Sequence, residues 1–386
     1  MSLFLETGYV SLNKFGEELC GDKVETIRNG DFTTLVLADG LGSGVKASIL
    51  STLTSKILCT MIANGLELED CVETILKSLP VCKVRGVAYS TFTIVHIDGQ
   101  GCGYLIEFDN PQAILIRDGR CLDFERQKLN VLGKDIYKTE LKLLKNDVVV
   151  TTSDGVVHAG IGMLLNFGWQ REEIKQFLEE HYGSEKSARA IAAQLGAACK
   201  DLYMDKPGDD TTIAAVRIRE SVPVDIMVGP PADKSQDDAA VGAFLKRPAR
   251  KIVCGGTSSQ LVARYLNRKL VTSFEFIDKD IPPVGHIDGI DLTTEGVITL
   301  RRVLELSERY LDINDVSPKY FERKDGASLL AELLFEQSSD VVFYVGRSVN
   351  IAHQGLPIDT TMKLKLVERL ANNLRAMGKT VELNYY

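Results

Sequence analysis

Four aspartates stand where carboxylates could act together on a metal ion. Asp39 and Asp154 each follow an apolar, β-prone run and precede a glycine, and Asp209 stands just before another such run. Asp22 is expected in a polar loop ahead of the first clear strand. Residues at strand ends are held rigidly, so their carboxylates can converge on one point. Hard oxygen ligands of this kind suit Mg²⁺ or Mn²⁺ better than Zn²⁺.

Each Asp-Gly pair also has a plainer interpretation as a turn. Asp98-Gly99 and Asp118-Gly119 are predicted to be turns and nothing more. The spacing alone does not show that the four acids meet. His158 follows Asp154 by four residues, and we expect this lone histidine to be structural.

The elements that must position these acids belong to the first half of the chain. Residues 33–38 predict a strand, and the glycine-rich segment 39–44 ends it. An apolar residue then recurs every four positions from Val45 to Met61, which predicts one broad apolar face of a helix. Between residues 88 and 152, short β-prone segments alternate with turn signals. Strands this close must pair antiparallel, because a parallel crossover needs about a dozen residues.

The second half has a different pattern. The chain of 386 residues is too long for one hydrophobic core, and the polar, proline-containing stretch 221–238 predicts a linker or domain entrance. Strands and helices alternate beyond it, including a predicted strand at 273–277, which is typical of an α/β domain. We therefore predict two domains, at residues 1–221 and 222–386.

One segment of the second domain could bind an anion. Gly255, Gly256, Thr257 and Ser258 lie between a predicted strand and a predicted helix, where backbone N–H groups are free. The segment is not a Walker loop and lacks the full dinucleotide fingerprint, so a plain strand-to-helix turn is the alternative. We predict a regulatory or dimerising domain that senses a small anionic ligand.

Composition excludes several classes of function. A net charge of −8 argues against an extended nucleic-acid surface. No apolar run approaches the roughly 20 residues that span a bilayer, and the first residues lack the basic start of a secretory signal. The eight cysteines are scattered without a regular spacing, as expected for buried thiols in a reducing cytoplasm. We expect neither nucleic acid nor membrane as a partner.

The order of motifs in the first half resembles that of a known family. It is similar to the PPM-type metal-dependent protein serine/threonine phosphatases, in the bacterial branch typified by the sporulation phosphatase SpoIIE. The resemblance covers roughly residues 5–220. It is carried, in order, by Cys20-Gly21-Asp22, Ala38-Asp39-Gly40-Leu41-Gly42-Ser43-Gly44, Tyr89-Ser90-Thr91-Phe92, Thr152-Ser153-Asp154-Gly155 and Gly208-Asp209-Asp210-Thr211-Thr212.

This resemblance implies a fold and a set of ligands. The expected fold is α+β, an αββα sandwich of two antiparallel sheets between helical layers, followed by the smaller α/β domain. Two divalent cations, Mn²⁺ or Mg²⁺, would be held by the carboxylates of Asp22, Asp39, Asp154 and Asp209 and the backbone carbonyl of Gly40. Asp210 would support these ligands from behind. Lys14 is a candidate for the substrate phosphate, since no arginine stands where eukaryotic relatives hold it.

The implied activity is hydrolysis of phosphoserine or phosphothreonine on a regulatory protein by a water that bridges the two metals. The pathway would be of the sigma-factor type, and a regulatory partner or homodimerisation could switch the enzyme. Two alternatives stay open. The chain could be a catalytically weak module that binds a phosphoprotein, or a phosphatase acting on a small metabolite.

Overall fold

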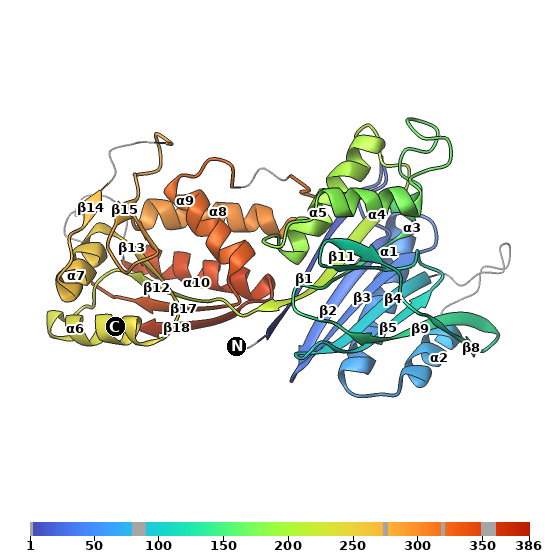
Figure 1. The fold of residues 1–386 in the computed structure, drawn as a ribbon, viewed down its shortest axis with the longest axis horizontal. Coiled ribbons are helices and arrows are strands. Elements are labelled where there is room, and N and C mark those ends of the chain that lie inside the picture. The colour runs from blue at the N-terminus through green and yellow to red at the C-terminus, as the bar shows by residue number, and fades with distance from the viewer. Residues whose placement is uncertain (1–2, 79–89, 273–276, 318–320, 349–359) are drawn as a thin grey trace. The chain divides into compact units, whose positions relative to one another are not determined.

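The chain forms two compact units in a computed structural model, which describes residues 3–78, 90–272, 277–317, 321–348 and 360–386 (Figure 1). Unit 1 comprises Met1–Glu220 and Ile313–Pro318, and unit 2 comprises Ser221–Asp312 and Lys319–Tyr386. The first unit carries the four aspartates, so its layers come first.

Unit 1 contains two antiparallel sheets. The first has the order β1-β11-β10-β6-β7, formed by Leu3–Leu12, Thr211–Glu220, Val148–Thr152, Ile114–Arg117 and Arg120–Leu122. The second has the order β2-β3-β4-β5-β9-β8, formed by Asp22–Asn29, Phe32–Gly40, Ser90–Asp98, Cys102–Phe108, Lys134–Lys142 and Gln127–Val131. Strands close in sequence pair through short turns, as the turn signals predicted.

Helices cover the outer face of each sheet. A core between the sheets includes Leu37 of β3 and Val149 of β10. The helices α4 (Arg171–Glu180) and α5 (Ala188–Leu202) pack on the first sheet, and α1 (Gly44–Ala63) and α2 (Leu68–Ser78) pack on the second. The short helix α3 (Asp154–Val157) follows β10. The predicted αββα sandwich is confirmed.

The predicted helix α1 turns a different face to the sheet than its apolar period suggested. Its buried side is mostly small, with Ala47, Ser51, Thr54 and Ser55 against the strands. The apolar stripe of Val45, Ile49 and Leu53 is at least half exposed. The physical reason is distance: a methyl group placed on Gly40 would lie 2.2 Å from the Ala47 carbonyl oxygen. A backbone approach this close admits only small side chains.

By length and composition alone, α1 is long and apolar enough to cross a membrane, contrary to what the sequence suggested. In unit 1, however, it packs along β2 and β3. Its small residues face the strands there, while the apolar stripe of Val45, Ile49 and Leu53 is at least half exposed.

A segment from the second half of the sequence completes the core of unit 1. Val316 is buried in the same cluster as Val10 of β1 and Ile213 of β11. A methyl group on Gly196 of α5 would lie 3.0 Å from Val316 Cγ1, and Ser11 N donates to the Ile313 carbonyl over 2.9 Å. We call Ile313–Pro318 the returning segment. The predicted division at residue 221 did not anticipate it.

Unit 2 is a three-layer α/β structure. Its sheet has the order β14-β15-β16-β13-β12-β17-β18, formed by Val271–Thr272, Gly285–His286, Leu292–Thr294, Arg250–Cys254, Pro223–Val228, Asp340–Val345 and Thr380–Tyr385. The five strands from β16 to β18 run parallel. One face packs on α8 (Val297–Leu311), α9 (Gly326–Glu332) and α10 (Thr360–Ala376). The other packs on α6 (Asp237–Lys246) and α7 (Gly256–Leu266).

The predicted linker at 221–238 contains β12, the middle one of the five parallel strands. Its proline is the first residue, a position where the missing N–H is tolerated, and the run that follows is too short to stand out in the sequence. A one-turn 3₁₀ helix (Lys234–Gln236) and a π-helical turn (Leu333–Gln337) complete the elements of this unit. The predicted strand at 273–277 lies almost wholly outside the described residues.

Replacing Val316 by alanine tests whether the returning segment belongs to unit 1. Removing its buried methyl groups should lower the free energy of unfolding of this unit by about 1–3 kcal/mol. The only tryptophan, Trp169, lies in the same cluster, so its fluorescence in urea reports this transition. Val45→Ala, at a 61% exposed side chain, is the control. An unchanged midpoint for Val316→Ala would contradict the assignment.

Candidate metal centre

Asp22 and Asp39 are direct cross-strand neighbours. Asp22 begins β2, and the ladder pairs it with Asp39 near the end of β3. Gly40 N donates to the Gly21 carbonyl over 3.1 Å, so Gly21 and Gly40 form a hydrogen-bonded cross-strand pair. Asp22 and Asp39, the next pair along the ladder, therefore form a non-hydrogen-bonded pair. Side chains of such a non-hydrogen-bonded pair lie especially close. The expectation of a loop at Asp22 was wrong because β2 holds few apolar residues.

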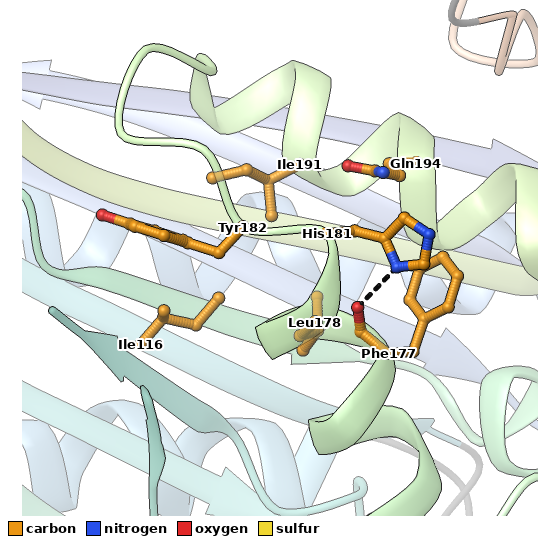
Figure 2. A pocket seen from close by; sticks show the side chains of 7 residues that line it. All are labelled: Ile116, Phe177, Leu178, His181, Tyr182, Ile191 and Gln194. Carbon is orange, nitrogen blue, oxygen red and sulfur yellow. Dashed lines mark hydrogen bonds between the residues drawn. The ribbon is translucent and has the colours of Figure 1, made fainter. Parts of the chain in front are cut away.

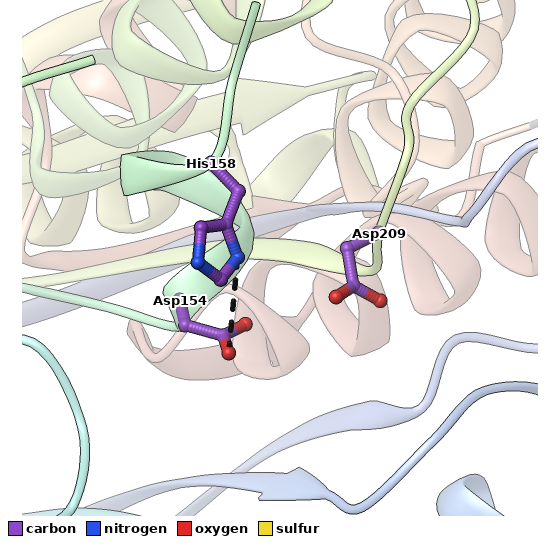
Figure 3. Close-up of side chains that lie close together, drawn as sticks. All are labelled: Asp154, His158 and Asp209. Carbon is purple, nitrogen blue, oxygen red and sulfur yellow. Dashed lines mark ion pairs between the residues drawn. The ribbon is translucent and has the colours of Figure 1, made fainter. Parts of the chain in front are cut away.

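Asp154 and Asp209 lie together beside the ends of two neighbouring strands of the first sheet. Asp154 follows β10 and Asp209 precedes β11, two strands that pair antiparallel. Ligand atoms of Asp154, Asp209 and His158 all lie within 4.8 Å of one another (Figure 3). His158 Nδ1 is 3.9 Å from Asp154 Oδ2, and its side chain is 47% exposed.

Electrostatics joins the two pairs into one cluster. Burial raises the pKa of Asp39 to about 9, and the charges of Asp22, Asp154 and Asp209 add to this increase. Burial also raises the pKa of Asp22 to about 7, although nearby hydroxyl groups oppose it. The pKa of Asp154 is raised by burial, with a further contribution from Asp209. These four carboxylates therefore repel one another when ionised.

Asp210 holds the surrounding chain in place. It is 4% exposed, and its Oδ1 accepts from Lys14 N over 3.0 Å. A methyl group on Gly21 would lie 2.7 Å from Asp210 Oδ2, so the carboxylate touches the residue before Asp22. Lys14 Nζ lies 3.8 Å from Asp209 Oδ1. Lys14 is thus a cation at the rim of the acidic cluster.

Two glycines that follow the aspartates are required by close backbone contacts. A methyl group on Gly155 would lie 2.1 Å from the Asp210 carbonyl oxygen, as one on Gly40 would meet Ala47. Tyr203 donates its hydroxyl to the Gly155 carbonyl over 2.7 Å. The Asp-Gly pairs are therefore not free turns. Gly40 allows the backbone of β3 to contact α1, and Gly155 allows α3 to contact the backbone at the start of β11.

The donor set fits divalent cations. Among the described residues, neither carboxylate oxygen of Asp22 has a hydrogen-bond partner, although both are buried. Buried unpaired carboxylate oxygens are costly unless a cation binds them. With Asp39, Asp154 and Asp209 around them, hard oxygen ligands dominate, as Mg²⁺ and Mn²⁺ prefer.

One residue of this cluster, His158, was not predicted to belong to it. His158 was expected to be structural, yet it lies with Asp154 and Asp209. The signal was its spacing of four residues, which brings it to the same side of α3 as Asp154. Tyr89, in one of the family motifs, lies outside the described residues. Gly255–Ser258 stand at the start of α7 in unit 2, apart in sequence from the acids.

A cavity elsewhere in unit 1 offers no competing site. It lies between α4 and α5 over β6, and His181 and Tyr182 line it with apolar side chains (Figure 2). Its volume is about 10 Å³, room for a single water at most. His181 Nδ1 lies 2.9 Å from the Phe177 carbonyl oxygen.

Comparison with known proteins identifies one matching family. Residues 29–219 match the family described as Stage II sporulation protein E (SpoIIE). This range contains Asp39, Asp154 and Asp209 and begins after Asp22. No protein of curated function matches the chain.

Several solved structures resemble part of this chain, and one with a TM-score of 0.50 supports its fold. The PP2C phosphatase domain with a fragment of the regulatory domain of SpoIIE from Bacillus subtilis has 21% identity and a TM-score of 0.50, over 57% of this chain and 65% of that chain. This chain thus spans less than two thirds of that structure. A SpoIIE phosphatase domain from the same organism, without domain swapping, has 19% identity and a TM-score of 0.46, over 57% and 95%. The RsbU and RsbW domains of Rv1364c from Mycobacterium tuberculosis have 16% identity and a TM-score of 0.44, over 64% and 70%.

Replacing Asp39 by asparagine should stabilise the metal-free protein. The pKa of Asp39 is about 9 in the folded state against an ordinary value of 3.8. Between these values the folded protein binds more protons than the unfolded chain, so its stability falls as pH rises. Asp39→Asn should therefore raise the Tm in EDTA by roughly 5 °C at pH 8 and by less at pH 5.

The same variant should lose the rise in Tm that Mn²⁺ gives the wild type. Asp205→Asn is the control, because the Asp205 side chain is 79% exposed. A Tm for Asp39→Asn below that of the wild type in EDTA at pH 8 would contradict the inferred repulsion between Asp39 and the other three carboxylates.

Replacing His158 by alanine tests its place among the ligands. If its imidazole binds the cation held by Asp154 and Asp209, Mn²⁺ affinity measured by calorimetry at pH 7 should fall about tenfold or more. His181→Ala is the matched control, since His181 stacks on Phe177. Equal Mn²⁺ affinities for His158→Ala and the wild type would exclude His158 from the site.

Proposed function

Because residues 29–219 match the SpoIIE family, we propose that this chain is a metal-dependent phosphatase that removes phosphate from serine or threonine of a regulatory protein. The observation that carries the proposal is the convergence of four carboxylates, one of them buried with both oxygens unpartnered among the residues that the structure describes. Bound cations would relieve the repulsion in such a cluster without protonation, and a phosphate ester is a substrate that cations at this point would polarise.

Two divalent cations, Mn²⁺ or Mg²⁺, would be held by Asp22, Asp39, Asp154 and Asp209, with the Gly40 carbonyl as a further ligand. When bound, they supply a water of lowered pKa and stabilise the charge of an in-line displacement at phosphorus. The protein contributes the geometry. Strand pairing fixes the two pairs of carboxylates before any cation arrives, so little reorganisation is needed on binding.

Residues around the carboxylates would position the substrate and the ligands. Asp210 ties the backbone of Lys14 to the start of β11, which keeps that loop against the acids. Lys14 Nζ, at 3.8 Å from Asp209, is placed to attract a phosphate oxygen at the rim. Its side chain is 38% exposed, so it can turn from Asp209 towards a bound phosphoprotein.

We extend the proposal to a cytoplasmic signalling system of the sigma-factor type, with a regulatory partner or a second copy of the chain as the switch. The match of residues 29–219 to the SpoIIE family supports this extension. The four carboxylates need cations to neutralise their charge. A partner that shifts these carboxylates or changes cation binding would therefore change the activity.

Replacing Asp154 by asparagine should abolish the activity. Asparagine keeps the shape of the side chain but removes the charge that holds a cation, so Mn²⁺-dependent hydrolysis of a phosphoserine peptide should fall by a factor of about 10³ or more. Phosphate release is measured with and without EDTA, beside p-nitrophenyl phosphate and a small phosphorylated metabolite.

Asp205→Asn controls for the loss of an acid in the same region and should keep wild-type activity. Its backbone is left-handed (φ 61°), a conformation that asparagine tolerates. Hydrolysis that survives Asp154→Asn would remove the assigned site. Hydrolysis of the metabolite alone would leave the cation site standing and reject a protein substrate.

A further inference from the structure

Two helices of unit 2 begin side by side at one edge of its sheet. The strands β13 and β16 are parallel neighbours, and α7 and α8 follow them directly. Gly255 N donates to the Thr294 carbonyl over 2.9 Å, and a methyl group on Gly296 would lie 3.3 Å from Gly255 Cα. The two turns therefore touch. Ligands of open α/β sheets bind at this carboxyl edge of the strands.

The start of α8 already binds an anion of its own. Glu295 Oε2 accepts from Ile298 N over 3.0 Å and from Thr299 N over 3.3 Å. This carboxylate satisfies two N–H groups that have no partner inside the helix. The positive end of the α8 dipole is thereby neutralised.

The start of α7 has no such group. Its N-cap is Gly255, with φ +116° and no side chain to accept a hydrogen bond. Among the described residues, no acceptor pairs with the backbone N–H groups of Gly256, Thr257 and Ser258. Gly256 is exposed, and a methyl group on it would meet nothing within 4 Å. The first turn of α7 is open to a ligand.

The Ser258 hydroxyl is directed at the same place. Ser258 is 0% exposed, and within the described parts of the chain its Oγ has no hydrogen-bond partner. This Oγ lies 3.5 Å from where a methyl group on Gly255 would stand. The next residue, Ser259, differs, because its Oγ donates to the Gly255 carbonyl over 2.8 Å. A buried hydroxyl without a partner is costly, and a ligand at the helix start would supply the acceptor.

We propose that Gly255–Ser258 bind the phosphate group of a small molecule. Three backbone N–H groups and one hydroxyl, unpartnered among the described residues, lie together in the first turn of α7, which suits an anion with several terminal oxygens. Glycine at 255 and 256 lets the anion approach the backbone. The shared chemistry is a phosphate group, either free or carried by a nucleotide. This site lies in unit 2 and is independent of the acidic cluster of unit 1.

Calorimetry on the full chain distinguishes the two sources of phosphate. The protein carries Asp39→Asn and is kept in EDTA, so that the acidic cluster cannot bind phosphate through cations. Inorganic phosphate, ADP and adenosine are titrated separately. Binding of phosphate or ADP near one site per chain, with no binding of adenosine, is the expected result. No heat from either phosphate-bearing probe at 10 mM, roughly ten times the Kd of a weak site, would overturn the proposal.

Two variants locate the site. Ser258→Ala should weaken binding of the phosphate-bearing probe about tenfold while leaving the Tm unchanged or higher, since the lost hydroxyl has no partner in the described parts of the chain. Gly256→Asp adds a like charge at the open position and should abolish binding. Ser307→Ala is the matched control: its buried hydroxyl donates to the Leu304 carbonyl over 2.6 Å, so the Tm should fall and the affinity should stay. Wild-type affinity in both Ser258→Ala and Gly256→Asp would refute the site.

Discussion

Four carboxylates that repel one another are held together by the strand pairing of unit 1. Asp22 faces Asp39 across β2 and β3, and Asp154 and Asp209 flank the pairing of β10 with β11. Because hydrogen-bonded ladders fix these strands, the carboxylates cannot separate to relieve the repulsion. The metal-free protein can respond only by keeping protons, which is what the raised pKa values of Asp22 and Asp39 describe. Binding of cations and release of these protons are therefore linked.

Close backbone contacts set the rest of the site's surroundings. Gly40 brings α1 against the second sheet, and Gly155 brings α3 against the start of β11. Both contacts exclude larger side chains, so the acids rest on backbone that has little freedom to shift. The cost is visible in α1, whose small residues face the sheet and whose apolar stripe, including Val45, faces outward. The helix is thus shaped by how near it must come to the metal centre, more than by the burial of its apolar residues.

Much of this arrangement could be predicted from residue patterns. The antiparallel strands of unit 1 followed from short spacings between turn signals, and the acids at Asp39 and Asp154 followed from apolar runs that end in Asp-Gly. Three features did not follow. The strand that begins at Asp22 has few apolar residues, β12 in the middle of the parallel strands is short and starts with proline, and the place of His158 depends on Asp209 as well as on Asp154. Each depends on pairings between distant segments, which local patterns do not encode.

The returning segment gives unit 1 an unusual dependence on the order of synthesis. Val316 fills a space beside Val10 and Gly196, yet it follows Glu220 by roughly a hundred residues. At about 5–20 residues per second, the ribosome adds it several seconds after the last strand of unit 1 is made. During that interval Val10, Gly196 and Ile213 lack the side chain of Val316 that packs with them in the folded unit. Unit 1 therefore acquires its complete core only after residues 221–312 of unit 2 have been made.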